Sequence, residues 1–114
     1  MIKDDLIFIS HILNSIKSIE EFCFNITSNE EFKNNRLVQS ATIRELEIIG
    51  EASKNIKVSF KEEYPEVPWK KISGLRDKLI HHYFGLDTNM IWEVIKYDIP
   101  KLKEDLTKIQ ENFI

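Results

Sequence analysis

The stretch IKDDLIFISHILNSIKSI (residues 2–19) decides the fold class, because its apolar residues return with the period of a helix. The stripe runs in steps of four, three, four and three through Ile2, Leu6, Ile9, Leu13 and Ile16. This spacing puts the stripe on one face of an α-helix, whereas a half-buried strand would alternate at every second residue. We expect the helix to continue to about residue 26.

The next signals along the chain predict two more helices. Ser28 followed by Glu31 matches a capping box, in which the hydroxyl and the carboxylate each satisfy an exposed amide, so a short helix should begin here. A longer apolar pattern without proline then runs from Asn35 to Ile56. Its expected apolar positions are Leu37, Val38, Ala41, Leu46, Ile49, Ala52 and Ile56.

Prolines and glycines divide the second half of the chain. Residues 64–68 (YPEVP) should form a loop, because each proline lacks an amide proton and disfavours helical geometry in the residue before it. A fourth helix should begin at Trp69 and end near Gly85, where glycine tolerates the left-handed cap. Its expected inner face carries Ile72, Leu75, Leu79 and His82.

A last helical pattern follows Asp87 or Thr88, either of which can cap it. We expect Pro100 to kink or split this helix, with Asp98 as a fresh cap. The core stripe comprises Ile91, Ile95, Ile99, Leu102, Leu106, Ile109 and Phe113. Together the patterns predict an all-α protein, an antiparallel bundle of four to five helices.

The composition fits a single globular domain over residues 1–114. Apolar residues make up 42% and charged residues 31%, which excludes a disordered chain. No apolar run approaches the roughly 20 residues of a membrane span, and the acidic start lacks the pattern of a secretory signal, so we expect a cytoplasmic protein. The lone Cys23 excludes an internal disulfide and a thiolate metal cluster and should be a small core residue.

The segment RDKLIHHY (residues 76–83) concentrates chemically active side chains within about two helical turns. RNA can be cut without a metal if a base removes the 2′-hydroxyl proton, an acid protonates the departing 5′-oxygen, and a cation stabilises the phosphorane between them. Arg76 can supply the cation, and His81 the acid or the base. Phosphodiester chemistry on RNA is therefore the first function to consider.

Helix geometry restricts how these groups can meet. On an ideal helix Arg76 and His81 point about 140° apart, whereas Arg76 and Tyr83 share a face. The arginine and the histidine could meet if the helix unwinds near Gly85. Alternatively, two copies could face each other across a two-fold axis and pool their motifs, which is the arrangement we prefer.

Each residue of the segment also has a structural explanation. His81 could simply complement the helix dipole, and His82 and Tyr83 fit buried or interface positions. Arg76 has as candidate acidic partners Glu45, Glu47 and Glu51.

The net charge of −3 argues against a protein that grips nucleic acid over its whole surface, so any RNA contact should be local. Arg44 and Glu51, seven residues apart, share a face of the third helix and either reach the segment or play a structural role. The sequence has one basic stretch, formed by Lys70, Lys71, Arg76 and Lys78. This stretch forms either an RNA contact or a solvated face.

The ordered pattern Arg-x4-His-x-Tyr, formed by Arg76, His81 and Tyr83, resembles the signature of the HepT-like branch of the HEPN superfamily. Further segments that look like those of the family are RELEIIGEA (44–52), YPEVPW (64–69), ISGLR (72–76), Phe84-Gly85 and Trp92. The similarity covers roughly residues 5 to 110, which is nearly the whole chain.

The resemblance implies a HEPN-like bundle that acts as a symmetric homodimer. It implies a metal-independent endoribonuclease without cofactors, the toxin of a type VII (HepT/MntA-like) toxin–antitoxin pair. Arg76 would hold the scissile phosphate, and His81 would act as acid or base. Possible supporting residues are Asp77, Lys78, His82 and Glu51.

The partner implied by the resemblance is a minimal nucleotidyltransferase antitoxin that transfers AMP from ATP to Tyr83. Nucleotides on this phenol would fill the RNA cleft with negative charge and bulk. Asp77 departs from the family pattern, in which asparagine or another polar residue is common. Its carboxylate could orient Arg76 or weaken its hold on phosphate.

Two other functions stay open. The chain could be a non-catalytic helical partner subunit of a minimal nucleotidyltransferase, with Tyr83 only packing against it, and the negative net charge favours this view. It could also be a purely structural helical dimer.

Overall fold

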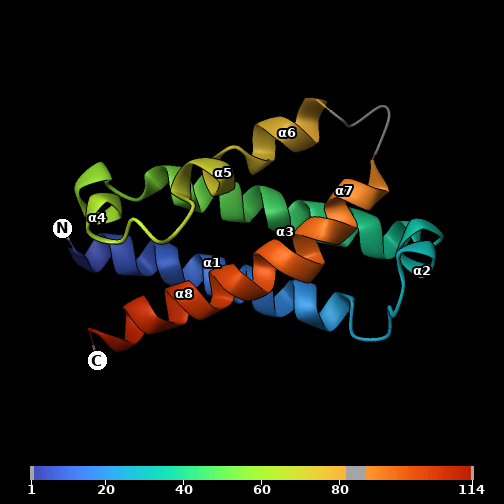
Figure 1. Cartoon of the computed structure of the whole chain (residues 1–114), viewed down its shortest axis with the longest axis horizontal. Coiled ribbons are helices and arrows are strands. Elements are labelled where there is room, and N and C mark those ends of the chain that lie inside the picture. The colour runs from blue at the N-terminus through green and yellow to red at the C-terminus, as the bar shows by residue number, and fades with distance from the viewer. Residues whose placement is uncertain (1, 82–86, 114) are drawn as a thin grey trace.

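The computed structural model describes residues 2–81 and 87–113, without the side chains of Ile80 and His81, and every regular element in these residues is helical (Figure 1). The elements are α1 (Ile2–Phe22), α2 (Asn29–Lys33), α3 (Arg36–Asn55), α4 (Val58–Glu63), α5 (Trp69–Ser73), α6 (Leu75–His81), α7 (Thr88–Glu93), the π-helical turn η1 (Val94–Asp98) and α8 (Ile99–Glu111). The all-α prediction is confirmed.

Two long helices form the centre of the bundle. α1 and α3 lie side by side and run in opposite directions, α8 packs against α1, and α5 and α6 pack against α3 (Figure 1). Most of the fully buried core side chains come from the first, third and last helices and include Ile9, Ile12, Ile16, Leu46, Ile49, Leu106 and Ile109. Each such side chain stabilises the fold by about 1.5–3 kcal/mol. None of the described helices is long and apolar enough to cross a membrane.

The first helix is shorter than predicted. α1 ends at Phe22 rather than near residue 26, because the chain turns at residues 23–25 and carries Phe24 outward, 82% exposed. α3 follows its predicted bounds, but the prediction of Leu37 as a core residue is wrong. Leu37 lies on the outer face of the first turn and is 80% exposed.

The predicted capping box is confirmed at the start of α2. The hydroxyl of Ser28 accepts a hydrogen bond from the Glu31 amide at 3.1 Å. The Glu31 carboxylate accepts one hydrogen bond from the Thr27 amide at 2.9 Å and another from the Thr27 hydroxyl. These two hydrogen bonds hold the pKa of Glu31 below its ordinary value of 4.5. The hydroxyl thus satisfies an amide that the helix itself leaves unpaired, and the carboxylate holds the residue directly before the N-cap.

The sequence did not predict α4, whose start is capped by a distant side chain. Asp5 of α1 is buried and accepts a hydrogen bond from the Lys57 amide at 3.0 Å, where α4 begins. Lys57 itself supplies no side-chain cap. The carboxylate therefore joins the start of α1 to the start of α4.

The predicted fourth helix is two helices, α5 and α6, which meet at Gly74. Its predicted inner face is confirmed for Ile72, Leu75 and Leu79, whereas His82 and the end near Gly85 lie outside the described residues. α3 approaches this junction closely through Gly50. A Cβ atom there would lie 3.3 Å from the Arg76 amide nitrogen and 3.3 Å from the Ile72 carbonyl oxygen.

The last segment begins as predicted and is split by η1. Asp87 caps α7 by accepting a hydrogen bond from the Met90 amide at 3.2 Å. Ile91, Ile95 and Ile99 step by four twice, which on a regular α-helix would carry the third residue about 80° off the core face. The wider turn of a π-helix accommodates this spacing, and all three residues are buried.

Pro100 stands in the first turn of α8, directly after η1, so helical structure continues through the predicted split from Thr88 to Glu111 and only its pitch changes, in the π-helical turn. The predicted Asp98 cap is wrong, because the Asp98 carboxylate instead accepts a hydrogen bond from the Lys71 ammonium group at 3.1 Å. Phe113 is 40% exposed and only partly belongs to the core. Cys23 is half-buried, and burial raises the pKa of its thiol.

Candidate functional site

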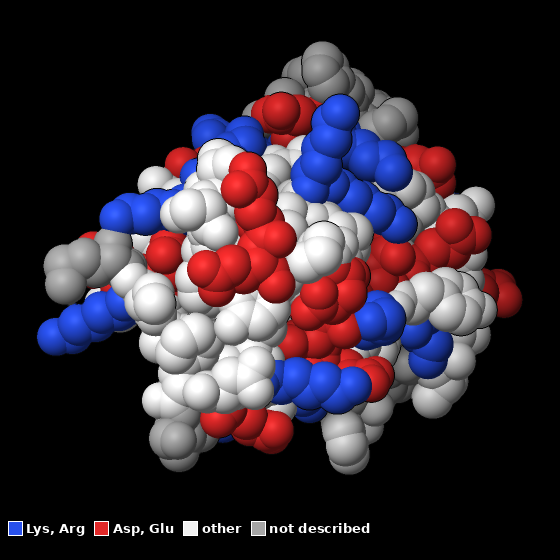
Figure 2. Space-filling model, turned by 60° about the vertical axis from the view of Figure 1, so that its left-hand side comes forward, with Lys and Arg blue, Asp and Glu red and all other residues white. Residues whose placement is uncertain are grey.

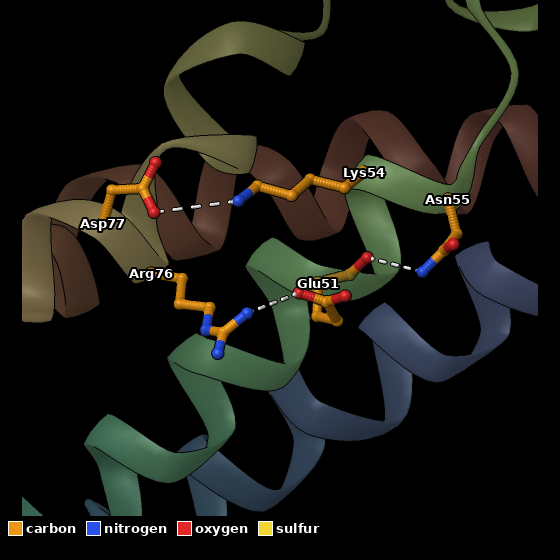
Figure 3. Close-up of polar contacts among 5 residues, drawn as sticks. All are labelled: Glu51, Lys54, Asn55, Arg76 and Asp77. Carbon is orange, nitrogen blue, oxygen red and sulfur yellow. Dashed lines mark hydrogen bonds and ion pairs between the residues drawn. The ribbon is translucent and has the colours of Figure 1, made fainter.

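Arg76 stands in the first turn of α6 and reaches across to α3. Its guanidinium donates a hydrogen bond from Nη1 to Glu51 Oε2 at 3.2 Å (Figure 3). Of the acidic partners considered from the sequence, Glu51 is therefore the one that the structure brings to Arg76. The two side chains are 49% and 54% exposed, so the guanidinium keeps further donors directed at solvent or at a ligand.

Asp77 pairs with a different residue of α3. Its carboxylate lies 3.7 Å from the Lys54 ammonium group (Figure 3), and no salt bridge joins it to Arg76 in the part of the chain that the structure describes. The two ion pairs attach the first turn of α6 to α3 at neighbouring points. Both are exposed, so each contributes at most about 1 kcal/mol. Lys78 is exposed and follows this turn.

The rest of the predicted catalytic segment lies partly beyond the described residues. The backbone of His81 ends α6, but its side chain, and all of His82 and Tyr83, lie outside them. Arg76 and Glu51 are thus brought together. The placement of the imidazole and the phenol relative to Arg76 stays a prediction.

A cleft of about 450 Å³ opens where α1, α3 and α6 meet. The side chains that give it polar and aromatic character are Phe8, His11, Arg44, Glu47, Glu51 and Arg76. Arg44 and Glu51 line the same cleft, as their seven-residue spacing on one face of α3 predicted. The volume lies in the range of about 300–1,000 Å³ that is typical of ligand sites.

Phe8 and His11 are the cleft residues that the sequence did not predict. Their rings meet edge to face, with centroids 6.0 Å apart and planes at 88°. In the sequence, Phe8 and His11 are three residues apart and stand beside the buried positions Ile9 and Ile12, so they were expected to share one side of α1. This spacing could not identify them as cleft residues, because only the docking of α1 against α3 turns that side of α1 toward Arg76.

The surface charge around the molecule is mixed. Figure 2 shows Lys and Arg side chains interspersed with Asp and Glu on the face it presents, so positive charge is local there. Within residues 2–79 and 87–113, no three His, Cys, Asp or Glu side chains gather in a way that could hold a metal ion.

Arg76, held by Glu51, can position an anion. A guanidinium binds phosphate oxygens through two parallel N–H groups, and its affinity benefits when its direction is fixed beforehand. Glu51 fixes one edge of Arg76, and the cleft leaves the remaining donors accessible. Arg76 can therefore hold a phosphate at the mouth of the cleft, next to the helix that carries His81.

Comparison with known proteins gives consistent matches over nearly the whole chain. The family model described as "Ribonuclease HepT-like" matches residues 12–109. A Methanocaldococcus jannaschii protein named as a gamma-glutamylcyclotransferase and proposed RNase is 49% identical over 111 residues, which cover 97% of the chain and 50% of that relative. The chain thus spans half the length of this relative.

Two other relatives are matched over nearly their full length. A second Methanocaldococcus jannaschii protein, named as a proposed RNase, is 46% identical over 104 residues, covering 91% of the chain and 94% of the relative. A Thermococcus cleftensis protein assigned as a ribonuclease HepT gives the same identity and coverage, 46%, 91% and 94%. No solved structure gives a significant match.

Proposed function

Because the chain belongs to the HepT-like ribonuclease family of the HEPN superfamily, we propose that it cleaves RNA without a metal ion, as the toxin of a type VII toxin–antitoxin pair in the cytoplasm. The observation that carries the proposal is the exposed Arg76, held by Glu51 at a cleft and followed five residues later by His81. The RNase names of relatives matched over 94% of their length support the same reading.

In the proposed reaction, the 2′-hydroxyl oxygen attacks the adjacent phosphorus and the bond to the 5′-oxygen breaks. A base takes the hydroxyl proton, and an acid returns a proton to the leaving oxygen. Arg76 binds the phosphate and stabilises the charge that builds on it in the transition state. His81 acts as the acid or the base, because an imidazole exchanges protons near neutral pH.

The proposal includes a homodimer. Arg76 and His81 of one helix diverge by about 140°, so a cleft at a two-fold axis would let the arginine of one copy work with the histidine of the other. This assigns the active site to the contact between the copies.

Regulation by a minimal nucleotidyltransferase antitoxin completes the proposal. The Tyr83 oxygen attacks the α-phosphorus of ATP, pyrophosphate leaves, and the phenol proton passes to solvent. The product carries AMP next to Arg76, where its negative charge competes with RNA for the guanidinium.

The test is cleavage of labelled RNA by purified protein in the presence of EDTA. We expect cleavage by the wild type and its loss in Arg76→Ala and His81→Ala. Arg36→Ala, which removes an exposed arginine from the first turn of α3, is the control and should cleave normally. Expression of the wild type and of Arg36→Ala should inhibit growth, whereas expression of Arg76→Ala or His81→Ala should not. Cleavage that requires added metal, or that persists in both variants, contradicts the proposal.

A second candidate function is favoured by the net charge of −3 and by the mixed surface of Figure 2. In this alternative the chain is a non-catalytic partner subunit of a minimal nucleotidyltransferase. Absence of RNA cleavage, together with co-purification of an adjacent nucleotidyltransferase and normal pairing of the His81→Ala variant, would support it.

A further inference from the structure

The cleft between α1, α3 and α6 holds more binding groups than the cleavage chemistry uses. Beside Arg76 it is lined by a second arginine, Arg44, and by the rings of Phe8 and His11. The proposed reaction uses only Arg76 among these groups. Cations combined with aromatic rings are what proteins use to hold a single nucleic-acid strand.

The two arginines differ in their partners. Arg76 donates to Glu51, whereas no carboxylate in the described part of the chain forms a salt bridge with Arg44. Arg44 stands about 10 Å along α3 from Glu51, so the cations occupy separate points of one cleft. A strand whose scissile phosphate lies at Arg76 can therefore offer a neighbouring phosphate to Arg44.

The ring pair provides a surface for a base. Phe8 is half-buried and packs against the core, and it holds His11 edge to face at a centroid distance of 6.0 Å. His11 is exposed, so its ring is accessible to a base at the wall of the cleft, beside the ring of Phe8. The cleft volume of about 450 Å³ allows for a unit of nucleotide size.

The balance of charges selects the class of ligand. The cleft is lined by two arginines and two glutamates, whose formal charges cancel. A bare phosphate gains little from such a site, whereas a nucleotide adds stacking and hydrogen bonds to its base. The carboxylate of Glu47, for example, can accept from an exocyclic amino group.

We infer that this cleft is a subsite for the nucleotide next to the scissile phosphate. Phe8 and His11 stack its base, and Arg44 holds the next phosphate of the strand. The inference rests on the proposed function, because it takes the scissile phosphate to lie at Arg76. It adds a binding role for α1 and for the first half of α3.

The test is binding of an uncleavable probe, a 2′-O-methyl RNA octamer of mixed sequence, which lacks the attacking hydroxyl. We expect Arg44→Gln and His11→Ala each to weaken binding about tenfold. Arg44→Gln should also reduce the slope of log Kd against log salt by about 0.7, as expected for one lost phosphate contact. Arg36→Gln removes the same charge from an exposed position on α3 and should bind normally. In RNA cleavage, KM should rise in the two cleft variants while kcat stays unchanged.

The outcomes separate the subsite from the cleavage chemistry. A wild type that binds the octamer through Arg44 yet leaves RNA intact supports the subsite and contradicts the proposed function. RNA cleavage with unchanged KM and unchanged octamer binding in Arg44→Gln overturns the subsite alone, as does equal weakening by Arg36→Gln. Absence of octamer binding by the wild type also overturns it. In that case, a shift of Arg44→Gln from dimer to monomer in sedimentation would identify the cleft as a contact between copies.

Discussion

Glu51 determines where the Arg76 guanidinium points. The Glu51→Gln variant keeps the size of the side chain but removes its charge, so Arg76 loses a charged partner and gains rotational freedom. We expect kcat for RNA cleavage to fall about tenfold, because a small displacement of a group that binds the transition state already lowers the rate. Stability should change by less than about 1 kcal/mol, because the pair is exposed.

The matched control for Glu51 is Glu45→Gln, a half-buried carboxylate on the same helix that does not line the cleft. It should leave kcat unchanged. Equal kcat values in the two variants would show that the Glu51 contact has no part in positioning Arg76.

Glu31 makes the stability of α2 depend on pH. Hydrogen bonds from the Thr27 amide and hydroxyl hold the pKa of the Glu31 carboxyl below its ordinary value of 4.5. A lowered folded-state pKa means that the ionised form contributes stability above the ordinary value, and that this contribution is lost as the pH falls through the folded-state pKa. Glu31→Gln should therefore unfold at lower urea concentration than the wild type at neutral pH, and the difference should shrink well below pH 4.5. A difference that stays constant with pH would contradict this reading.

At the scale of elements, α4 depends on one carboxylate from α1. Asp5→Ala removes the acceptor of the Lys57 amide in a place where Asp5 is only 3% exposed. Loss of a helix cap costs about 0.5–2 kcal/mol, and we expect a loss of stability of this size in chemical denaturation. Asp4→Ala, at the exposed neighbouring position, should lose almost nothing. Equal losses would show that the cap has no special role.

Gly50 sets the distance between α3 and the start of α6. Alanine is the better helix former by about 1 kcal/mol, but its Cβ atom would lie 3.3 Å from two backbone atoms that cannot rotate away. Overpacking of this kind costs about 1–3 kcal/mol, so we expect Gly50→Ala to be destabilising by about 1 kcal/mol in total, and to reduce cleavage by displacing Arg76. Ser40→Ala on the exposed face of α3 should be neutral. A Gly50→Ala protein that is more stable than the wild type would refute the steric argument.

Elements with local signals were predictable, and elements with distant causes were not. The apolar stripe of α1, the capping box of α2 and the Asp87 cap each depend on residues that are close together in the sequence, so a local pattern was enough to predict them. α4 is short, and its cap comes from Asp5, 52 positions away. Asp98 looked like a cap, but the docking of α5 assigns it to Lys71.

At the scale of the whole molecule, a dimer in which two copies pool their motifs makes a specific prediction. When Arg76→Ala and His81→Ala proteins are mixed and allowed to exchange, each heterodimer has one site with both native side chains and one site with neither. We expect RNA cleavage to reappear in the mixture, although each variant alone is inactive. An inactive mixture with demonstrated subunit exchange would mean that each copy supplies both groups of its own site.

The candidate site was predictable only in part, for a reason that belongs to the whole molecule. Residue types and helical spacing along single helices identified Arg76 and left three glutamates of α3 as its candidate partners, and the packing of α6 on α3 selects Glu51 among them. Phe8 and His11 join the cleft because α1 and α3 pack with one particular rotation, which no local pattern specifies. An analysis of one helix at a time therefore identifies the reactive side chains but misses the residues of neighbouring helices that line the cleft around them.

The π-helical turn lets the last segment lose one residue without changing its register. Removing the exposed Lys96, for example, would bring Ile91 and Ile99 to a spacing of seven residues, which a regular α-helix turns through about 700°, or 20° short of two full turns. Both side chains would still share the core face, so a regular turn would replace the π-helical one and α7 would keep its orientation. Natural variants of this protein should therefore tolerate the loss of one residue within 94–98, whereas the loss of a second would rotate α7 by about 100° and carry Ile91 off the core face.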